Sequence, residues 1–176
     1  MTGVQTCALP ILGEATDPES TLGPMVNEKS VAKIAELVDD AVKKGGRLLL
    51  GGTRLNRPGY FYPPTVIADV PQNARLLKEE IFGPVAALQA FDSDNEVIAK
   101  ANDTEYGLTA YLYTGDLKRG LAISDKLEVG MIGLNRGLVS DPAAPFGGVK
   151  QSGLGREGAH HGLLEFTECK YIAVNW

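Results

Sequence analysis

Residues 145–158 read PFGGVKQSGLGREG and form a glycine-rich stretch near the end of the chain. Glycine has no Cβ atom, so its backbone adopts left-handed angles and allows another backbone or a ligand to approach closely. Pro145 fixes its own φ and favours an extended residue before it. The stretch is therefore predicted to be a shaped loop. Phe146, which this loop carries, either plugs a core or lines a pocket.

The composition is that of an ordinary globular domain, and it excludes several classes of function. The chain has 176 residues, of which 44% are hydrophobic and 22% charged, and this length suits one domain. The net charge is −5 and the Lys and Arg residues are scattered, so we expect no nucleic-acid partner. No apolar run approaches the roughly 20 residues of a membrane span, so no membrane partner is expected.

The two cysteines, Cys7 and Cys169, form neither a disulfide framework nor, with the histidines, a zinc pattern. We therefore expect no metal site and a reducing, cytoplasmic location. Residues 1–11, MTGVQTCALPI, also lack the basic start and long apolar core of a secretory signal. They resemble the in-frame translation of a common sequencing-library adapter, so we interpret them as a non-native leader and exclude Cys7 as a nucleophile.

The first half of the chain is predicted to contain one long helix and two short strands. The helix begins after Asn27, which suits an N-cap, and ends at Gly45. Residues 47–50 form a short strand, and residues 60–67 form an edge or irregular strand because two prolines interrupt them. The apolar stripe of the helix has helical spacing and consists of Val31, Ile34, Ala35, Val38, Ala41 and Val42.

Strands and helices then alternate. Residues 85–91 are almost all apolar, as in a strand that is covered on both faces. Ser93 and Glu96 form a capping box for a short helix. Strands at 108–114 and 129–134 flank a second helix, which begins after Asp116. This order predicts an α/β fold with a mostly parallel sheet.

The last third carries the loop and two further elements. Ligands of parallel sheets bind beyond the carboxyl ends of the strands, so the segment that follows Asn135 is a candidate functional loop. Residues 156–164 are predicted to form a helix, and residues 166–174 a final strand that pairs with another chain. His160 and His161 are adjacent, so on a helix they point about 100° apart and are expected at the surface.

The glycines at 153, 155 and 158 match the pattern GxGxxG of dinucleotide-binding loops. That pattern needs a strand before it and a full βαβ unit around it, and too few residues follow Gly158 for such a unit. We therefore assign this spacing no phosphate-binding role.

Residues 75–84, RLLKEEIFGP, place two carboxylates beside an aromatic ring. In one interpretation, Glu79 and Glu80 are simply solvated at the end of a helix. In the other, Glu80 faces a ligand, because an ionised carboxylate accepts two hydrogen bonds from a diol such as a ribose. Phe82 would then lie beside the ring of the same ligand.

Three runs carry a resemblance to a known family. They are EEIFGPV at residues 79–85, ANDTEYGL at 101–108, and PFGGVKQSGLGREG at 145–158. With these runs in this order, the chain from about residue 12 resembles the C-terminal portion of an aldehyde dehydrogenase. The pattern GMIGLNRGLVS followed by APFGGVKQSGLGREG is most similar to the succinate-semialdehyde dehydrogenases. The resemblance implies that residues 12–164 belong to the catalytic domain and that residues 165–176 are an oligomerisation strand.

The resemblance also implies roles for four residues and a cofactor, NAD or NADP. Glu80 would hold the hydroxyls of the nicotinamide ribose, and Phe82 would pack against the nicotinamide. Phe146 would line the aldehyde tunnel, and Ser140 would donate a hydrogen bond to the carboxylate of an ω-carboxy aldehyde. The parent enzyme would be a homo-oligomer that oxidises an aldehyde to an acid.

In the family, the nucleophilic cysteine, the general-base glutamate and the Rossmann domain precede the matched region. No catalytic residue is therefore assigned within this chain, and we expect the isolated chain to be inactive. Cys169 does not replace the nucleophile, because it lies on the predicted terminal strand.

Two departures from the family pattern weaken the choice of substrate. Arg136 stands where Thr or Glu is usual and either attracts a carboxylate or is solvated, and Asp141-Pro142 alters the segment after Ser140. Two alternatives stay open beside succinate semialdehyde. One is a dehydrogenase of glutarate semialdehyde or another small aldehyde, and the other is a non-catalytic oligomerisation or binding module.

Overall fold

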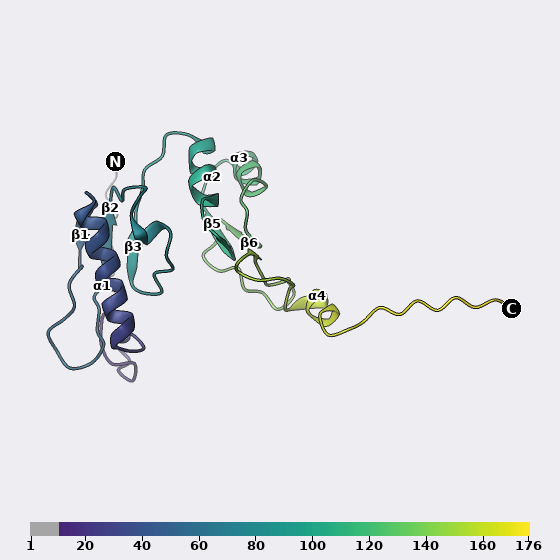
Figure 1. Cartoon of the computed structure of the whole chain (residues 1–176), viewed down its shortest axis with the longest axis horizontal. Coiled ribbons are helices and arrows are strands. Elements are labelled where there is room, and N and C mark those ends of the chain that lie inside the picture. Colours follow the sequence, from purple (N-terminus) through teal and green to yellow (C-terminus); the bar gives the residue numbers. More distant parts are fainter. Residues whose placement is uncertain (1–10) are drawn as a thin grey trace. The chain divides into compact units, whose positions relative to one another are not determined.

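The computed structural model describes residues 11–176 and divides into two compact units, unit 1 (Met1–Ala90) and unit 2 (Phe91–Trp176), as Figure 1 shows. Unit 1 contains α1 (Glu28–Lys43), β1 (Arg47–Leu50), β2 (Thr65–Ala68), the 3₁₀ helix η1 (Arg75–Leu77) and β3 (Val85–Ala87). Unit 2 contains α2 (Asp94–Asn102), β4 (Tyr106–Gly107), β5 (Thr109–Leu112), α3 (Leu117–Ser124), β6 (Met131–Leu134), β7 (Val149–Lys150) and α4 (Ala159–Leu164). Nearly all of the predicted leader, Cys7 included, lies outside the described residues.

The long helix of unit 1 forms where the sequence predicts it. The side chain of Asn27 accepts a hydrogen bond from the backbone N of Ser30 at 2.9 Å, which caps the helix. The buried stripe differs from the prediction at two positions. Leu37 is fully buried at 0% exposure, whereas Val42 is 39% exposed. Leu37 lies near the centre of the stripe, one turn after Ile34, and Val42 lies at its edge.

Unit 1 has one three-stranded sheet, in the order β1-β2-β3. β2 pairs antiparallel with β1 and parallel with β3, so it is the central strand. Of the two alternatives predicted for residues 60–67, an edge strand or an irregular one, the edge position is therefore wrong, while the β1–β2 pairing does contain a register shift. Pro63 and Pro64 have no N–H group to donate to a neighbouring strand. The strand therefore begins only after them, at Thr65.

β3 is shorter and more exposed than predicted. Val85 and Ala87 pack against the core of unit 1, while Ala86 is exposed between them. Leu88, just after the strand, is exposed as well. The prediction of a strand covered on both faces is wrong for this chain, because only one face of β3 meets α1 and its neighbours.

In unit 2, β5 and β6 pair in parallel, from Thr109 opposite Met131 to Leu112 opposite Leu134. The capping residues predicted for the two helices, Ser93 and Asp116, cap α2 and α3. Gly120 is buried in α3. A Cβ atom at Gly120 would lie 2.9 Å from Leu134 Cδ1 and 3.0 Å from Thr114 Cγ2, so the absence of a side chain there allows α3 to approach β6 closely.

The α/β class is confirmed, and the strands are distributed over three small sheets. The β2–β3 and β5–β6 pairs are parallel, and the β1–β2 and β4–β7 pairs are antiparallel. α4 begins at Ala159 rather than at residue 156. Gly158, the residue before it, has a φ of 73°, which is not helical, so the helix does not start earlier. His160 and His161 are exposed on α4, as predicted.

The C-terminal segment, residues 165–176, contains no helix or strand in this chain. The predicted strand at 166–174 is therefore not formed within the chain, and its pairing with another chain stays a prediction. The large apolar side chains of this segment are exposed: Phe166, Tyr171, Ile172, Val174 and Trp176.

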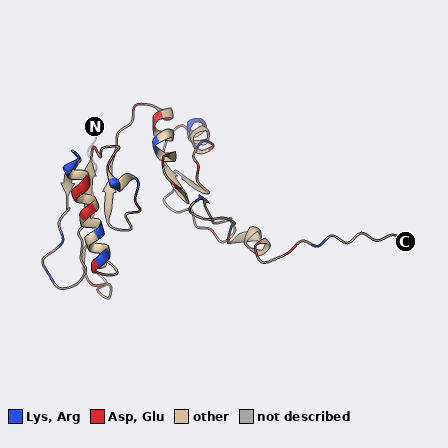
Figure 2. Cartoon of the chain, viewed as in Figure 1, with Lys and Arg blue, Asp and Glu red and all other residues tan. Residues whose placement is uncertain are grey.

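Charges of both signs are interspersed along the chain, and Figure 2 shows both signs on α1. None of the helices over residues 11–176 combines the length and the apolar character that crossing a bilayer requires.

A carboxylate of α1 makes unit 1 sensitive to acid. Asp40 Oδ2 accepts a hydrogen bond from the backbone N of Arg75 at 2.9 Å, and Lys44 Nζ donates to the same carboxylate at 3.0 Å. These donors hold the pKa of Asp40 below its ordinary value of 3.8. Because the folded-state pKa is the lower one, the ionised carboxylate stabilises the native state above that value and loses this effect as the pH falls through the folded pKa.

We therefore expect the free energy of unfolding to fall as the pH is lowered below about 4. Asp40→Asn should flatten this dependence, because asparagine carries no charge to protonate. Urea unfolding followed by circular dichroism at a series of pH values measures it, with Asp39→Asn as the matched control on the same helix. Indistinguishable pH profiles for the two variants would contradict the role given to Asp40.

Candidate functional site

The turn that follows η1 is held by α1 at two points. Lys33 Nζ donates a hydrogen bond to the backbone O of Glu80 at 2.6 Å. Gly83 packs against Ile34, so closely that a Cβ atom at Gly83 would lie 2.2 Å from Ile34 Cδ1. Helix α1 therefore fixes both the start and the end of residues 80–83.

Phe82 lies between these two points in an unusual conformation. Its φ is 47°, in the left-handed region that a bulky residue rarely adopts, and its side chain is 82% exposed. Strained backbone of this kind points to a functional role. The ring borders a cavity of about 370 Å³, whose other lining residues are Pro24, Met25, Val26, Ser30, Lys33 and Ile81.

The structure separates the two neighbouring carboxylates. Arg75 donates two hydrogen bonds to Glu79, at 2.5 and 3.1 Å, and this ion pair holds the pKa of Glu79 below its ordinary value. The carboxylate of Glu79 is thus engaged by its own helical neighbour. Glu80 is exposed, and its backbone rather than its carboxylate contacts Lys33. Of the pair, Glu80 is the exposed one, and its contact with a ligand stays a prediction.

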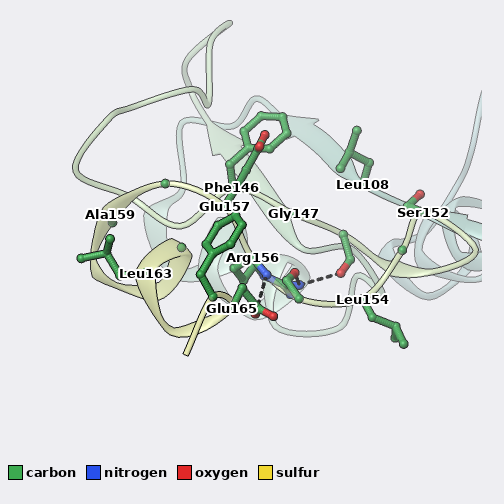
Figure 3. Close-up of a pocket in the computed structure, with 16 residues that line it drawn as sticks. Leu108, Phe146, Gly147, Ser152, Leu154, Arg156, Glu157, Ala159, Leu163 and Glu165 are labelled. Atoms are coloured by element: carbon green, nitrogen blue, oxygen red, sulfur yellow. Dashed lines mark hydrogen bonds between the residues drawn. The ribbon is translucent and has the colours of Figure 1, made fainter. Parts of the chain in front are cut away.

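In unit 2 the glycine-rich loop folds back on itself. Phe146 and Glu157 exchange two backbone hydrogen bonds, at 2.7 and 2.8 Å. Arg156 Nη1 donates to the carbonyl oxygens of Gly148 and Gly155, both at 2.7 Å. Figure 3 shows Arg156 within the loop, with hydrogen bonds drawn as dashed lines. Arg156 thus connects the two sides of the loop.

Two glycines are required for this arrangement. A Cβ atom at Gly130 would lie 1.9 Å from the carbonyl O of Gly147, so only a residue without a side chain allows β6 to pass the loop there. Gly155 has a φ of 77° and lies against the carboxylate of Glu165. The same carboxylate accepts a hydrogen bond from the backbone N of Arg156 at 3.0 Å.

The loop and α4 line an open cavity of about 700 Å³, within the range of small-molecule sites. Phe146 is half-buried and lines it, as Figure 3 shows. Leu108 and Leu163 add apolar surface, and Arg156 adds the donor groups described above. Of the two interpretations of Phe146, the structure agrees with the ring that lines a pocket.

The segment after β6 begins with a fixed turn. Asn135 has a φ of 54°, and its side chain accepts from the backbone N of Thr114 at 2.8 Å and donates to the backbone O of Thr114 at 2.9 Å. Asp141 Oδ1 accepts from the backbone N of Ala143 at 2.9 Å, which gives a second turn. Ser140 is exposed between these turns, and Arg136 is exposed as well.

The four predicted site residues thus fall in both units. Glu80 and Phe82 lie in unit 1, and Ser140 and Phe146 lie in unit 2. The two phenylalanines line cavities, while Glu80 and Ser140 are exposed and are not among the residues lining these two cavities. Their roles remain predictions.

The sequence interpretation missed two residues that shape these sites, Lys33 and Arg156. Lys33 is separated from Glu80 by 47 positions, and no local pattern signals such a contact. Arg156 lies inside the glycine-rich stretch. Its isolated position among glycines is the only sequence feature that could have indicated its role in the loop.

Comparison with known proteins identifies the family. The model of the aldehyde dehydrogenase family matches residues 4–172. The chain belongs to the aldehyde dehydrogenase family. The match begins within residues 1–11, whose origin as a leader stays a prediction.

Among curated aldehyde dehydrogenases, the NADP(+) succinate-semialdehyde dehydrogenase of Escherichia coli K12 is 47% identical over 163 residues. A glutarate-semialdehyde dehydrogenase of Pseudomonas putida KT2440 is 45% identical. Both alignments cover 93% of this chain and 34% of the relative, so the chain spans about a third of the length of these relatives.

Solved aldehyde dehydrogenase structures agree. An NADP-dependent enzyme of E. coli superposes with a TM-score of 0.92 at 46% identity, covering 95% of this chain and 35% of the other. The NAD+ complex of an aldehyde dehydrogenase from Bacillus cereus superposes with a TM-score of 0.89 at 40% identity, covering 94% and 34%.

Proposed function

We propose that this chain is the part of a semialdehyde dehydrogenase that contacts the nicotinamide end of the cofactor and orients the aldehyde, and that the whole enzyme oxidises succinate semialdehyde to the acid with NAD or NADP. The similarity to curated succinate-semialdehyde dehydrogenases at 47% identity carries this proposal. The geometry supports it, since an exposed carboxylate and an exposed aromatic ring occur together on one anchored turn beside a cavity.

Each residue has a defined task in this proposal. The Glu80 carboxylate accepts hydrogen bonds from the two ribose hydroxyls, and Phe82 offers its face to the planar nicotinamide. When bound, the nicotinamide takes up the hydride that leaves the aldehyde carbon. Phe146 provides apolar surface for the aldehyde chain, and the Ser140 hydroxyl donates to the distal carboxylate. Together these contacts orient the aldehyde and restrict its movement.

The attacking thiolate and the base that activates water belong, by the resemblance, to the part of the family that precedes the matched region. This chain then provides binding and orientation. We also propose that the exposed C-terminal segment, residues 165–176, pairs with another subunit in a homo-oligomer. Its apolar side chains would be buried by that pairing. The cytoplasmic location stays a prediction.

A second substrate is favoured by a specific observation. The glutarate-semialdehyde relative is nearly as similar, at 45% identity. Both aldehydes carry a distal carboxylate and differ in length, so the same serine donor serves either of them. Relative rates on the two aldehydes distinguish them.

The role of Ser140 can be tested in a chimera, in which residues 12–176 replace the matching segment of the E. coli succinate-semialdehyde dehydrogenase. Ser140→Ala should weaken transition-state binding of succinate semialdehyde by about 1–3 kcal/mol where the assembled site buries the serine hydroxyl, because the carboxylate then loses a desolvated donor. The measurement is kcat/KM for succinate semialdehyde and for an aldehyde of equal length without the carboxylate. An equal loss on both aldehydes would contradict carboxylate recognition by Ser140.

A further inference from the structure

Helix α1 and its C-cap residue Lys44 carry a row of polar side chains that bond the segment from Asn73 to Glu80. Residues spaced by four and seven positions lie on one face of a helix. Three side chains on this face reach the backbone of residues 73–80. The bonds are Lys44 Nζ to Asn73 O at 2.8 Å, Arg75 N to Asp40 Oδ2 at 2.9 Å, and Lys33 Nζ to Glu80 O at 2.6 Å.

The last of these bonds lies next to the strained residue. Phe82 adopts its positive φ between the Lys33 contact at Glu80 and the packing of Gly83 on Ile34. Lys33 and Ile34 are consecutive residues of α1, so two neighbouring positions on one helix hold the two ends of the turn. A strained backbone conformation persists only where surrounding contacts impose it.

We propose that Lys33 is a positioning residue, whose ammonium group holds the backbone of Glu80 so that the Glu80 carboxylate and the Phe82 ring are presented together. The inference rests on the proposed function, in which these two groups contact the nicotinamide nucleotide. Lys33 acts through the backbone of the turn and is not itself a ligand of the reacting atoms. The ammonium bond is charge-assisted, which makes it stronger than a neutral hydrogen bond.

The first measurement is amide hydrogen exchange of the whole chain, with Lys33→Met as the variant. Methionine keeps an apolar side chain of similar length and removes the donor. We expect peptides covering residues 79–84 to exchange faster, on the order of tenfold, while peptides from the buried face of α1 are unchanged. Lys29→Met, at an exposed lysine one turn earlier, is the matched control, and Lys33→Arg should restore slow exchange because arginine donates as well.

The second measurement uses the chimera. Lys33→Met should raise the Michaelis constant for the nicotinamide cofactor on the order of tenfold with little change in kcat, and Lys33→Arg should reverse most of this. Exchange at residues 79–84 that equals that of the Lys29→Met control would overturn the proposal. Faster exchange with an unchanged Michaelis constant would instead contradict the proposed cofactor contact of Glu80 and Phe82.

Discussion

Purified residues 1–176 are expected to form no NADH or NADPH above the reagent blank when they are given succinate semialdehyde and either cofactor. The proposal gives this chain contacts to the aldehyde and the nucleotide but no attacking thiolate. Orientation without a nucleophile does not form the covalent intermediate through which the family reacts. Because enzymes accelerate such reactions by at least about a millionfold, the difference from a complete enzyme should be unmistakable.

The assay follows the absorbance of the reduced nicotinamide, with the full-length E. coli relative as the positive control. Cys169→Ser is the informative second sample, because Cys169 is the exposed thiol among the described residues. Turnover by the isolated chain that Cys169→Ser abolishes would show that the chain contains its own nucleophile, and the proposal would then be wrong.

Leu37→Ala should destabilise unit 1 by about 2–5 kcal/mol. Leu37 is fully buried and belongs to the cluster that α1 forms with the sheet, together with Ile34, Val38 and Ile67. Removing its side chain forfeits buried apolar surface and leaves a cavity that rigid neighbours fill only in part. Since a domain is stabilised by only about 5–15 kcal/mol, the loss is a large fraction of the whole.

Urea unfolding followed by far-ultraviolet circular dichroism measures this effect. Leu49→Ala is the matched control, because Leu49 on β1 is 51% exposed and its loss should change stability by about 0.5 kcal/mol or less. Equal shifts of the unfolding midpoint in the two variants would show that α1 does not pack against the sheet as the structure has it.

The features that the sequence predicted correctly are those whose cause is local. Asn27, Ser93 and Asp116 each cap the helix that follows them, because a side-chain oxygen two or three residues before a free N–H suffices for a cap. The stripe of α1 was likewise visible from its periodicity. Leu37, which the prediction omitted, and Val42, which is exposed, show that periodicity alone does not decide which residues of the stripe are buried.

The features that the sequence did not predict depend on distant partners. The central position of β2 follows from pairing with strands on both sides, which the prolines at 63 and 64 concealed. The exposure of β3 depends on which other elements cover its sheet. The chain spans about a third of the length of its relatives.

For the candidate site, motifs indicated Glu80, Phe82 and Phe146, but not how they are held. The paired state of Glu79, the anchor at Lys33 and the bridge made by Arg156 appear only in the fold. Sequence patterns therefore indicated the candidate ligand contacts but not the residues that hold them in place.

The most direct test of the central claim is the rate at which the chimera reduces its nicotinamide cofactor with succinate semialdehyde. If residues 12–176 orient the nicotinamide and the aldehyde for a thiolate encoded outside them, the chimera turns over and Glu80→Gln raises its Michaelis constant for the cofactor. A folded chimera that produces no reduced nicotinamide would contradict the account. So would a chimera whose Michaelis constant for the cofactor is unchanged by Glu80→Gln.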